Sequence, residues 1–389
     1  MKLNADGDGN RTVILKTTLL LAAITINALE FFLPRIPFLP WLKPGLANCV
    51  TLLWIIRYGG KDALLFSLLR IWLIGFYFGI SLVTLSLALS GGVLATCAMG
   101  IVWHTFGRRG LIGTVGTAIV GAIFHNMGQI IAVFFLLAYN VYLFYQVPIM
   151  IIASLVFGGL VGVLTPLLSQ LAEQAFNESD RAIISLPENR MASRTYTTIS
   201  VAMLLLSISL VFIHSRMVLL VLALLITLSV QVVHSVSLRA LFSPVRRFWL
   251  LFLFVAFFHL FPARGTRVPW IPFLTYEGIQ STSVQWLRLW SWLQISLLLT
   301  YFKFHTVIFL TLSFFFRRHK FTLYAGLLAV EDFPEVFDLI RKRATMEFRS
   351  MLRHPITTSR DFLCRAFYDV ADYVVRRHCE AIGEERGSE

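Results

Sequence analysis

Residues 173–195 read EQAFNESDRAIISLPENRMASRT and form a polar interruption between two long apolar blocks. The first block, residues 1–172, consists of apolar runs separated by very short polar turns. The second block, residues 196–316, leads into a basic tail at residues 317–389. We therefore expect two membrane modules in one polypeptide, joined by a polar linker and followed by cytoplasmic basic helices.

The composition of the chain indicates that lipid surrounds most of it. Hydrophobic residues make up 57% and charged residues 14% of the sequence, whereas about 25% of a typical soluble domain is charged. The formal net charge of +13 lies between and after the apolar runs, as the positive-inside rule predicts, so nucleic-acid binding is not expected. The four cysteines are far apart in the sequence, so neither a disulfide framework nor a metal site is expected.

Hydrophobic length predicts an all-α polytopic membrane protein, with about ten transmembrane helices in two bundles plus cytoplasmic coupling helices. Lys and Arg gather on one side of the predicted crossings, which places both termini in the cytoplasm, in a bacterial inner membrane. The run at 304–316 is interpreted as a re-entrant or surface continuation. The predicted crossings are 13–32, 45–58, 62–79, 81–103, 111–138 and 147–172 in the first block and 197–213, 217–238, 248–261 and 286–302 in the second.

Polar side chains inside the predicted spans indicate where function lies, because each costs free energy in lipid unless it is paired or faces a cavity. Asn, Gln and Thr also serve as hydrogen-bonded contacts between membrane helices. A buried guanidinium such as Arg70 together with the imidazole of His125 favours a pocket, since two such groups are costly as packing alone. The candidates for substrate binding are Asn48, Thr51, Arg70, His125, Asn126 and Gln129.

These residues also carry a family resemblance. Four runs, in this order, resemble the membrane family called Gx transporter or heptaprenyl diphosphate synthase component I: LPRIPFLPWLKPGLANCVTLL, KDALLFSLLRIWLIGFYFG, LALSGGVLA and GAIFHNMGQIIAVFFLLA. This family is similar to the substrate-binding S components of energy-coupling-factor transporters. The resemblance implies a six-helix bundle that captures a small substrate, with the polar candidates in or around its pocket. Many S components dock through Ala-x-x-x-Ala on their first helix, and the nearest pattern here is Thr18-x-x-x-Ala22.

The second block resembles the transmembrane T component of the same transporters. The runs that carry this resemblance are TYEGIQSTSVQWLRLWSWLQISLLLT and LYAGLLAVEDFPEVFDLIRKRATMEFRSM. The resemblance implies coupling to an ATPase through Phe348-Arg349-Ser350, with Glu385-Arg386-Gly387 as a second candidate. A basic helix beside a membrane also binds anionic lipid, at about 1 kcal/mol per Lys or Arg. Coupling and lipid attachment therefore both remain open for Arg349 and Arg386.

The sequence contains no sign of its own ATPase or of another enzyme. Gly60-Lys61 is followed by Asp62, and Ile55 stands where a P-loop has its first glycine. Prenyl diphosphate synthesis needs clustered aspartates for magnesium, and the chain has no Asp-Asp pair. We expect an importer component without a cofactor of its own, whose partners are membrane lipid, a small-molecule substrate and ABC ATPase subunits that hydrolyse the ATP. The alternative is a non-transporting accessory protein in isoprenoid or quinone metabolism.

Overall fold

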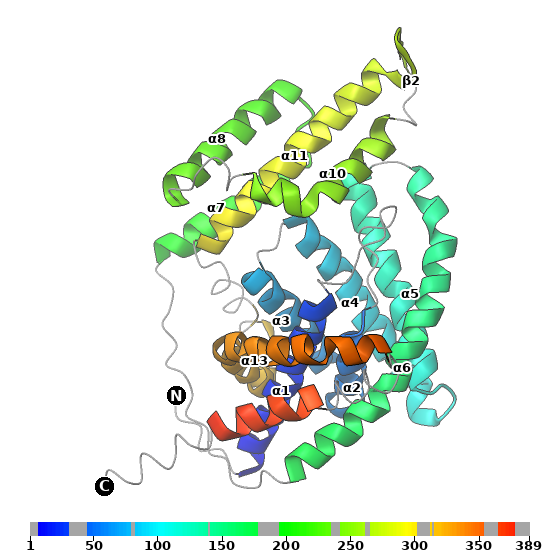
Figure 1. Cartoon of the computed structure of the whole chain (residues 1–389), viewed down its shortest axis with the longest axis vertical. Helices are drawn as coiled ribbons and strands as arrows, with labels where there is room; N and C mark the ends of the chain where they lie inside the picture. Colours follow the sequence, from blue (N-terminus) through cyan, green and yellow to red (C-terminus); the bar gives the residue numbers. More distant parts are fainter. Residues whose placement is uncertain are drawn as a thin grey trace.

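The computed structural model describes residues 7–30, 45–78, 82–138, 141–177, 194–234, 242–260, 265–301, 312, 315–353 and 365–377. Within these residues the chain is helical apart from one short hairpin, so the expected all-α membrane fold is confirmed (Figure 1). About ten crossings were predicted from hydrophobic length. Among the described residues, four helices are long and apolar enough to cross a membrane: Val83–Arg109, Thr114–Leu137, Val141–Glu173 and Arg216–Val233.

The described residues of the first block form six α-helices: α1 Gly7–Glu30, α2 Asn48–Tyr58, α3 Gly60–Phe78, α4 Leu82–Thr105, α5 Thr114–Val133 and α6 Val147–Asn177. Shorter turns connect them: η1 Gly107–Arg109, the π-helical η2 Phe134–Ala138 and η3 Val141–Gln146. Helix α2 has 11 residues and is therefore about 16 Å long, roughly half of the hydrocarbon core. It is a short buried helix, in contrast to the crossing predicted at 45–58. Gly45 and Gly59 flank it with positive φ angles of 68° and 87°, which glycine adopts readily.

Close helix packing fixes the orientation of α5. A Cβ atom at Gly128 would lie 2.5 Å from the Ser90 carbonyl oxygen of α4. On another side of α5, a Cβ atom at Gly162 of α6 would lie 2.4 Å from the Val115 Cα. Small residues allow membrane helices to approach this closely. Helix α5 is thus held between α4 and α6, and the side chains of its two faces meet different neighbours.

The second block consists of α7 Arg194–Ser209, α8 Arg216–His234, α10 Ser243–Leu260 and α11 Tyr276–Tyr301. The hairpin of β1 Arg267–Val268 and β2 Ile271–Thr275 precedes α11, which begins well before the crossing predicted at 286–302. Indole N–H groups along α11 bind it to its neighbours: Trp286 donates to the Phe252 carbonyl at 3.0 Å, Trp290 to Thr227 Oγ1 at 2.9 Å and Trp292 to the Ser207 carbonyl at 3.0 Å.

The tail returns to the first block. After η4 Arg317–His319 it forms α13 Lys320–Arg353, which packs on α1 and α3 (Figure 1). Ala325 and Ala329 of α13 are fully buried, and Gly326 lies beside Leu69 of α3. The helix at 365–377 contributes Phe367, Val370 and Val374 to the same hydrophobic core. Most of the predicted continuation at 304–316 lies outside the described residues.

The two hydrophobic cores therefore do not follow the two apolar blocks of the sequence. One core unites Trp54 and Phe66 of the first block with Phe333 of the tail. The other unites Val83 and Ile130 of the first block with Trp292 of α11. Each core contains residues from both sides of the polar interruption, so the first block is in contact with the tail at one region and with the second block at another.

Candidate functional site

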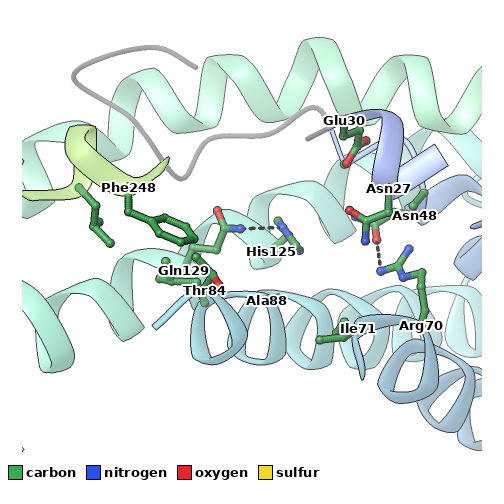
Figure 2. A pocket seen from close by; sticks show the side chains of 14 residues that line it. Asn27, Glu30, Asn48, Arg70, Ile71, Thr84, Ala88, His125, Gln129 and Phe248 are labelled. Carbon is green, nitrogen blue, oxygen red and sulfur yellow. Dashed lines mark hydrogen bonds between the residues drawn. The ribbon is translucent and has the colours of Figure 1, made fainter. Parts of the chain in front are cut away.

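A cavity of about 90 Å³ with polar and apolar walls lies among the helices of the first block, and Phe248 of α10 in the second block lies at one end of it (Figure 2). Its walls come from α1, the start of α2, α3, α4, α5 and α10. Four of the six predicted substrate-binding residues, Asn48, Arg70, His125 and Gln129, line it. The remaining lining residues are Asn27, Glu30, Gly45, Ala47, Ile71, Thr84, Leu87, Ala88, Phe248 and Leu251.

Arg70 of α3 is the cation of this cavity. Its side chain is 3% exposed, and its Nη2 donates to Asn48 Oδ1 over 3.1 Å. The Nε and Nη1 atoms are buried and have no hydrogen-bond partner in the structure. Arginine keeps its charge in proteins, and a buried donor without an acceptor is costly. The guanidinium is therefore incompletely satisfied, and the cavity beside it is where an acceptor can be placed.

His125 and Gln129 form the polar wall contributed by α5. The Gln129 amide donates through Nε2 to His125 Nε2 at 3.0 Å, and the amide oxygen Oε1 is buried without a partner. A Cβ atom at Gly91 of α4 would lie 2.9 Å from the His125 carbonyl oxygen, so α4 packs directly against this turn of α5. His125 and Gln129, which are one helical turn apart in the sequence, therefore lie on one face of α5 and form a hydrogen bond.

Glu30 and Phe248 are cavity residues that the sequence did not identify. Glu30 ends α1, is 6% exposed and accepts a hydrogen bond from the Leu46 N–H. Phe248 comes from the second block, where α10 departs from helical geometry with φ −112° and ψ 18° at this residue. Glu30 lies at the end of a predicted span, where an acidic residue is expected at the membrane surface and does not indicate a cavity. No local pattern relates Phe248 to α5.

Asn126 and Thr51 lie outside the lining of this cavity. Asn126 donates to Ser154 Oγ at 2.8 Å and to the Met150 carbonyl at 3.3 Å, and so joins α5 to α6. Thr51 of α2 is fully buried. Of the predicted coupling residues, Arg349 lies in the last turns of α13, and Arg386 lies outside the described residues.

A second buried polar group, here named the Asp62 cluster, joins the first block to the tail. It consists of Lys16, Trp54, Asp62, His319 and Thr322. Lys16 Nζ lies 2.5 Å from one carboxylate oxygen of Asp62, and the Trp54 indole donates to the same oxygen at 3.0 Å. Thr322 donates to the other oxygen at 2.7 Å, and His319 Nδ1 lies 2.8 Å from it. Both carboxylate oxygens are therefore satisfied, and α1, α2, α3, η4 and α13 meet at one residue.

Three polar residues of the second block, Glu277, Arg288 and His259, have hydrogen-bond partners in the structure. Glu277 accepts from the Thr266 N–H at 2.9 Å and holds the hairpin to the start of α11. Arg288 donates to the Ile213 carbonyl at 2.6 Å, between α7 and α8. His259 of α10 lies 2.9 Å from the Leu137 carbonyl in the π-helical turn and 2.8 Å from Ser281 Oγ. The contact of His259 with Leu137 joins the two blocks.

The exposed face of the tail carries a network of ion pairs. Arg343 lies 2.5 Å from Asp369, and Arg377 lies 2.8 Å from Glu335, so the helix at 365–377 is fastened to α13. The hydrogen bond from Tyr373 and the charge of Arg377 lower the pKa of Glu335, and burial raises the pKa of Tyr373 to about 12. These pairs stabilise the two tail helices against each other.

The fold and cavity define a helical membrane protein with a partly open cavity that has polar and apolar side chains in its walls. Residues 19–168 match the family model described as heptaprenyl diphosphate synthase component I. The first membrane block is therefore similar to this family, as the resemblance predicted; the match does not extend to the second block or the tail. No curated protein and no solved structure matches the chain. The family description names one component of a synthase.

Proposed function

We propose that the chain captures a small molecule in the Arg70 cavity and serves as the membrane part of an energy-coupling-factor-type importer. In this proposal the first block acts as the S component, the second block and tail act as the T component, and separate ABC ATPase subunits hydrolyse the ATP. The observation that carries the proposal is the cavity itself. Four predicted polar residues meet there around a buried guanidinium with unused donors, and a membrane protein rarely keeps such a group without a functional reason.

The contacts between the blocks support a coupled movement. Asp62 and Arg70 lie on the same helix, α3, about 12 Å apart along its axis. A displacement of α13 at Thr322 reaches Asp62 directly and the cavity through α3. Phe248 of α10 forms part of the cavity wall, so a displacement of the second block also opens or closes it. The docking pattern of α1 is consistent with this arrangement, because Thr18 and Ala22 are buried and α1 packs against α13.

Substitution of Arg349 tests the coupling part of the proposal. A guanidinium inserted in an acidic groove makes charge-assisted contacts that fix orientation, so Arg349→Glu is expected to release the ATPase and stop uptake. Arg353→Glu lies one turn further along α13 and changes the net charge equally, which makes it the matched control. Co-purification of ATPase subunits with each full-length variant is the measurement. If the two substitutions have equal and weak effects, each near the ~1 kcal/mol of one lipid contact, coupling through Arg349 is wrong.

The family description favours a second candidate function. A protein described as component I of heptaprenyl diphosphate synthase has a further component as partner, and an accessory role in isoprenoid or quinone metabolism would use the same membrane block. Affinity purification of the tagged chain separates the two functions. Co-purified ABC ATPases support the importer, whereas a co-purified soluble prenyl synthase supports the accessory role and contradicts coupling.

A further inference from the structure

We infer that the cavity takes a small monoanionic carboxylate that also carries a hydrogen-bond donor. The inference rests on the proposed function, because it names the substrate class of the same site. It begins from Arg70, whose Nε and Nη1 donors are buried, unpaired and next to the cavity. A guanidinium binds a carboxylate through two parallel N–H···O contacts in one plane, made by Nη2 together with either Nε or Nη1. Asn48 accepts one N–H of Nη2, and the other completes such a pair. The contact of Nη2 with Asn48 fixes that plane before the ligand arrives.

The charges of the cavity favour one negative charge on the ligand over two. Among the described residues that line the cavity, Arg70 is the single permanent cation and Glu30 the single carboxylate. A phosphate monoester carries about 1.5 to 2 negative charges at neutral pH and would bring them close to Glu30 in a poorly solvated space, where repulsion is strong. A carboxylate satisfies the same guanidinium donors with less repulsion.

The end of the cavity away from Arg70 fits a ligand that has a hydrogen-bond donor and a short apolar part. Figure 2 shows Arg70 and Asn48 at one end, Gln129 and Phe248 at the other, and His125 between them. Gln129 Oε1 is a buried acceptor without a partner, so an O–H or N–H group of the ligand would satisfy it. Leu87 and Phe248 provide the apolar wall next to it. A hydroxy acid of a few carbons, with its hydroxyl group at the end away from the carboxylate, has the required groups at its two ends.

Thermal unfolding of the full-length protein in detergent tests this class of ligand. The probes are sodium 3-hydroxypropionate, propionamide and sodium phosphate, each against sodium chloride of equal ionic strength. Only 3-hydroxypropionate is expected to raise the unfolding temperature, by about 2 °C or more at saturation. Propionamide has a similar size but lacks both the charge and the hydroxyl group, and phosphate has negative charge without the planar carboxylate.

Two variants locate the effect. Arg70→Gln is expected to abolish the rise, whereas Arg288→Gln, which removes a buried arginine of α11 outside the cavity, should retain it. If Arg70→Gln does not fold, Arg70→Lys replaces it; this variant keeps the charge but loses the paired donors, so most of the rise should disappear. An equal rise with propionamide, a larger rise with phosphate, or no rise with 3-hydroxypropionate overturns the carboxylate class. The capture function is judged separately, by whether the purified protein retains any small molecule.

Discussion

The Asp62 cluster and the Arg70 cavity are two buried polar regions on the same helix, α3, and they differ in how completely their polar atoms are paired. In the Asp62 cluster, Lys16 and Thr322 satisfy the carboxylate from opposite ends of the chain. In the Arg70 cavity, Nη2 of the guanidinium donates to Asn48 Oδ1, and its Nε and Nη1 atoms have no acceptor. The Asp62 cluster therefore holds helices together with all of its carboxylate oxygens paired, whereas the Arg70 guanidinium has unpaired donors beside a cavity.

This difference separates structural polar residues from candidate binding residues. A buried charge that is fully hydrogen-bonded fixes one arrangement of helices, and the removal of one partner leaves the other charge uncompensated. A buried charge with unused donors does not stabilise the empty protein, because those donors have lost water without gaining acceptors. Substitutions in the two regions should therefore have opposite profiles: a loss of stability at Asp62 and a loss of ligand at Arg70.

The largest change in stability is expected from Asp62→Ala. The substitution leaves the buried Lys16 ammonium without its carboxylate, at a cost of about 3–5 kcal/mol in the free energy of unfolding. Denaturant titration in mixed micelles measures this cost. Arg57→Ala is the control, since it removes an ion pair with Glu173 in which the glutamate side chain is 62% exposed, and such pairs contribute about 0–1 kcal/mol. Equal effects of the two substitutions would show that the Asp62 cluster does not stabilise the contact between the first block and the tail.

A smaller change is expected from Asn126→Ala, which tests the distinction between helix contact and pocket. The variant loses two hydrogen bonds between α5 and α6 and should lower the unfolding free energy by about 1–2 kcal/mol. Retention of a bound small molecule should be unchanged, because Asn126 does not line the Arg70 cavity. Loss of the ligand without loss of stability would place Asn126 in the binding site and contradict this assignment.

Hydropathy and the cost of polar groups in lipid predicted much of the fold and part of the site. Apolar length located most helices, and the polar positions Arg70, His125 and Gln129 could be selected because few other reasons place such groups inside a span. The prediction for Asn126 and Thr51 relied on the same signal, which does not distinguish a pocket from a helix contact. Helix periodicity does not separate the two roles either, because Asn126 and Gln129 are three residues apart and lie near each other on α5.

The parts that the sequence did not predict depend on contacts between distant segments. Lys16 and Asp62 are 46 residues apart, and Asp62 and Thr322 are 260 residues apart. In the local sequence each of these residues resembles an ordinary polar residue at the end of a membrane span, so it does not indicate a buried cluster. The buried face of α13 was missed for a related reason, since a basic amphipathic helix has the same pattern whether its apolar side meets lipid, a partner protein or the chain itself.

The central claim is that Arg70 is kept for binding and not for stability, and native mass spectrometry of wild-type protein and Arg70→Leu tests it most directly. Replacement of a buried charge by an apolar side chain of suitable size is often neutral or stabilising, so the unfolding free energy should change by less than about 1 kcal/mol. The wild-type protein should carry a small non-lipid molecule that is absent from the equally folded variant. Retention of the same molecule by Arg70→Leu would contradict the claim.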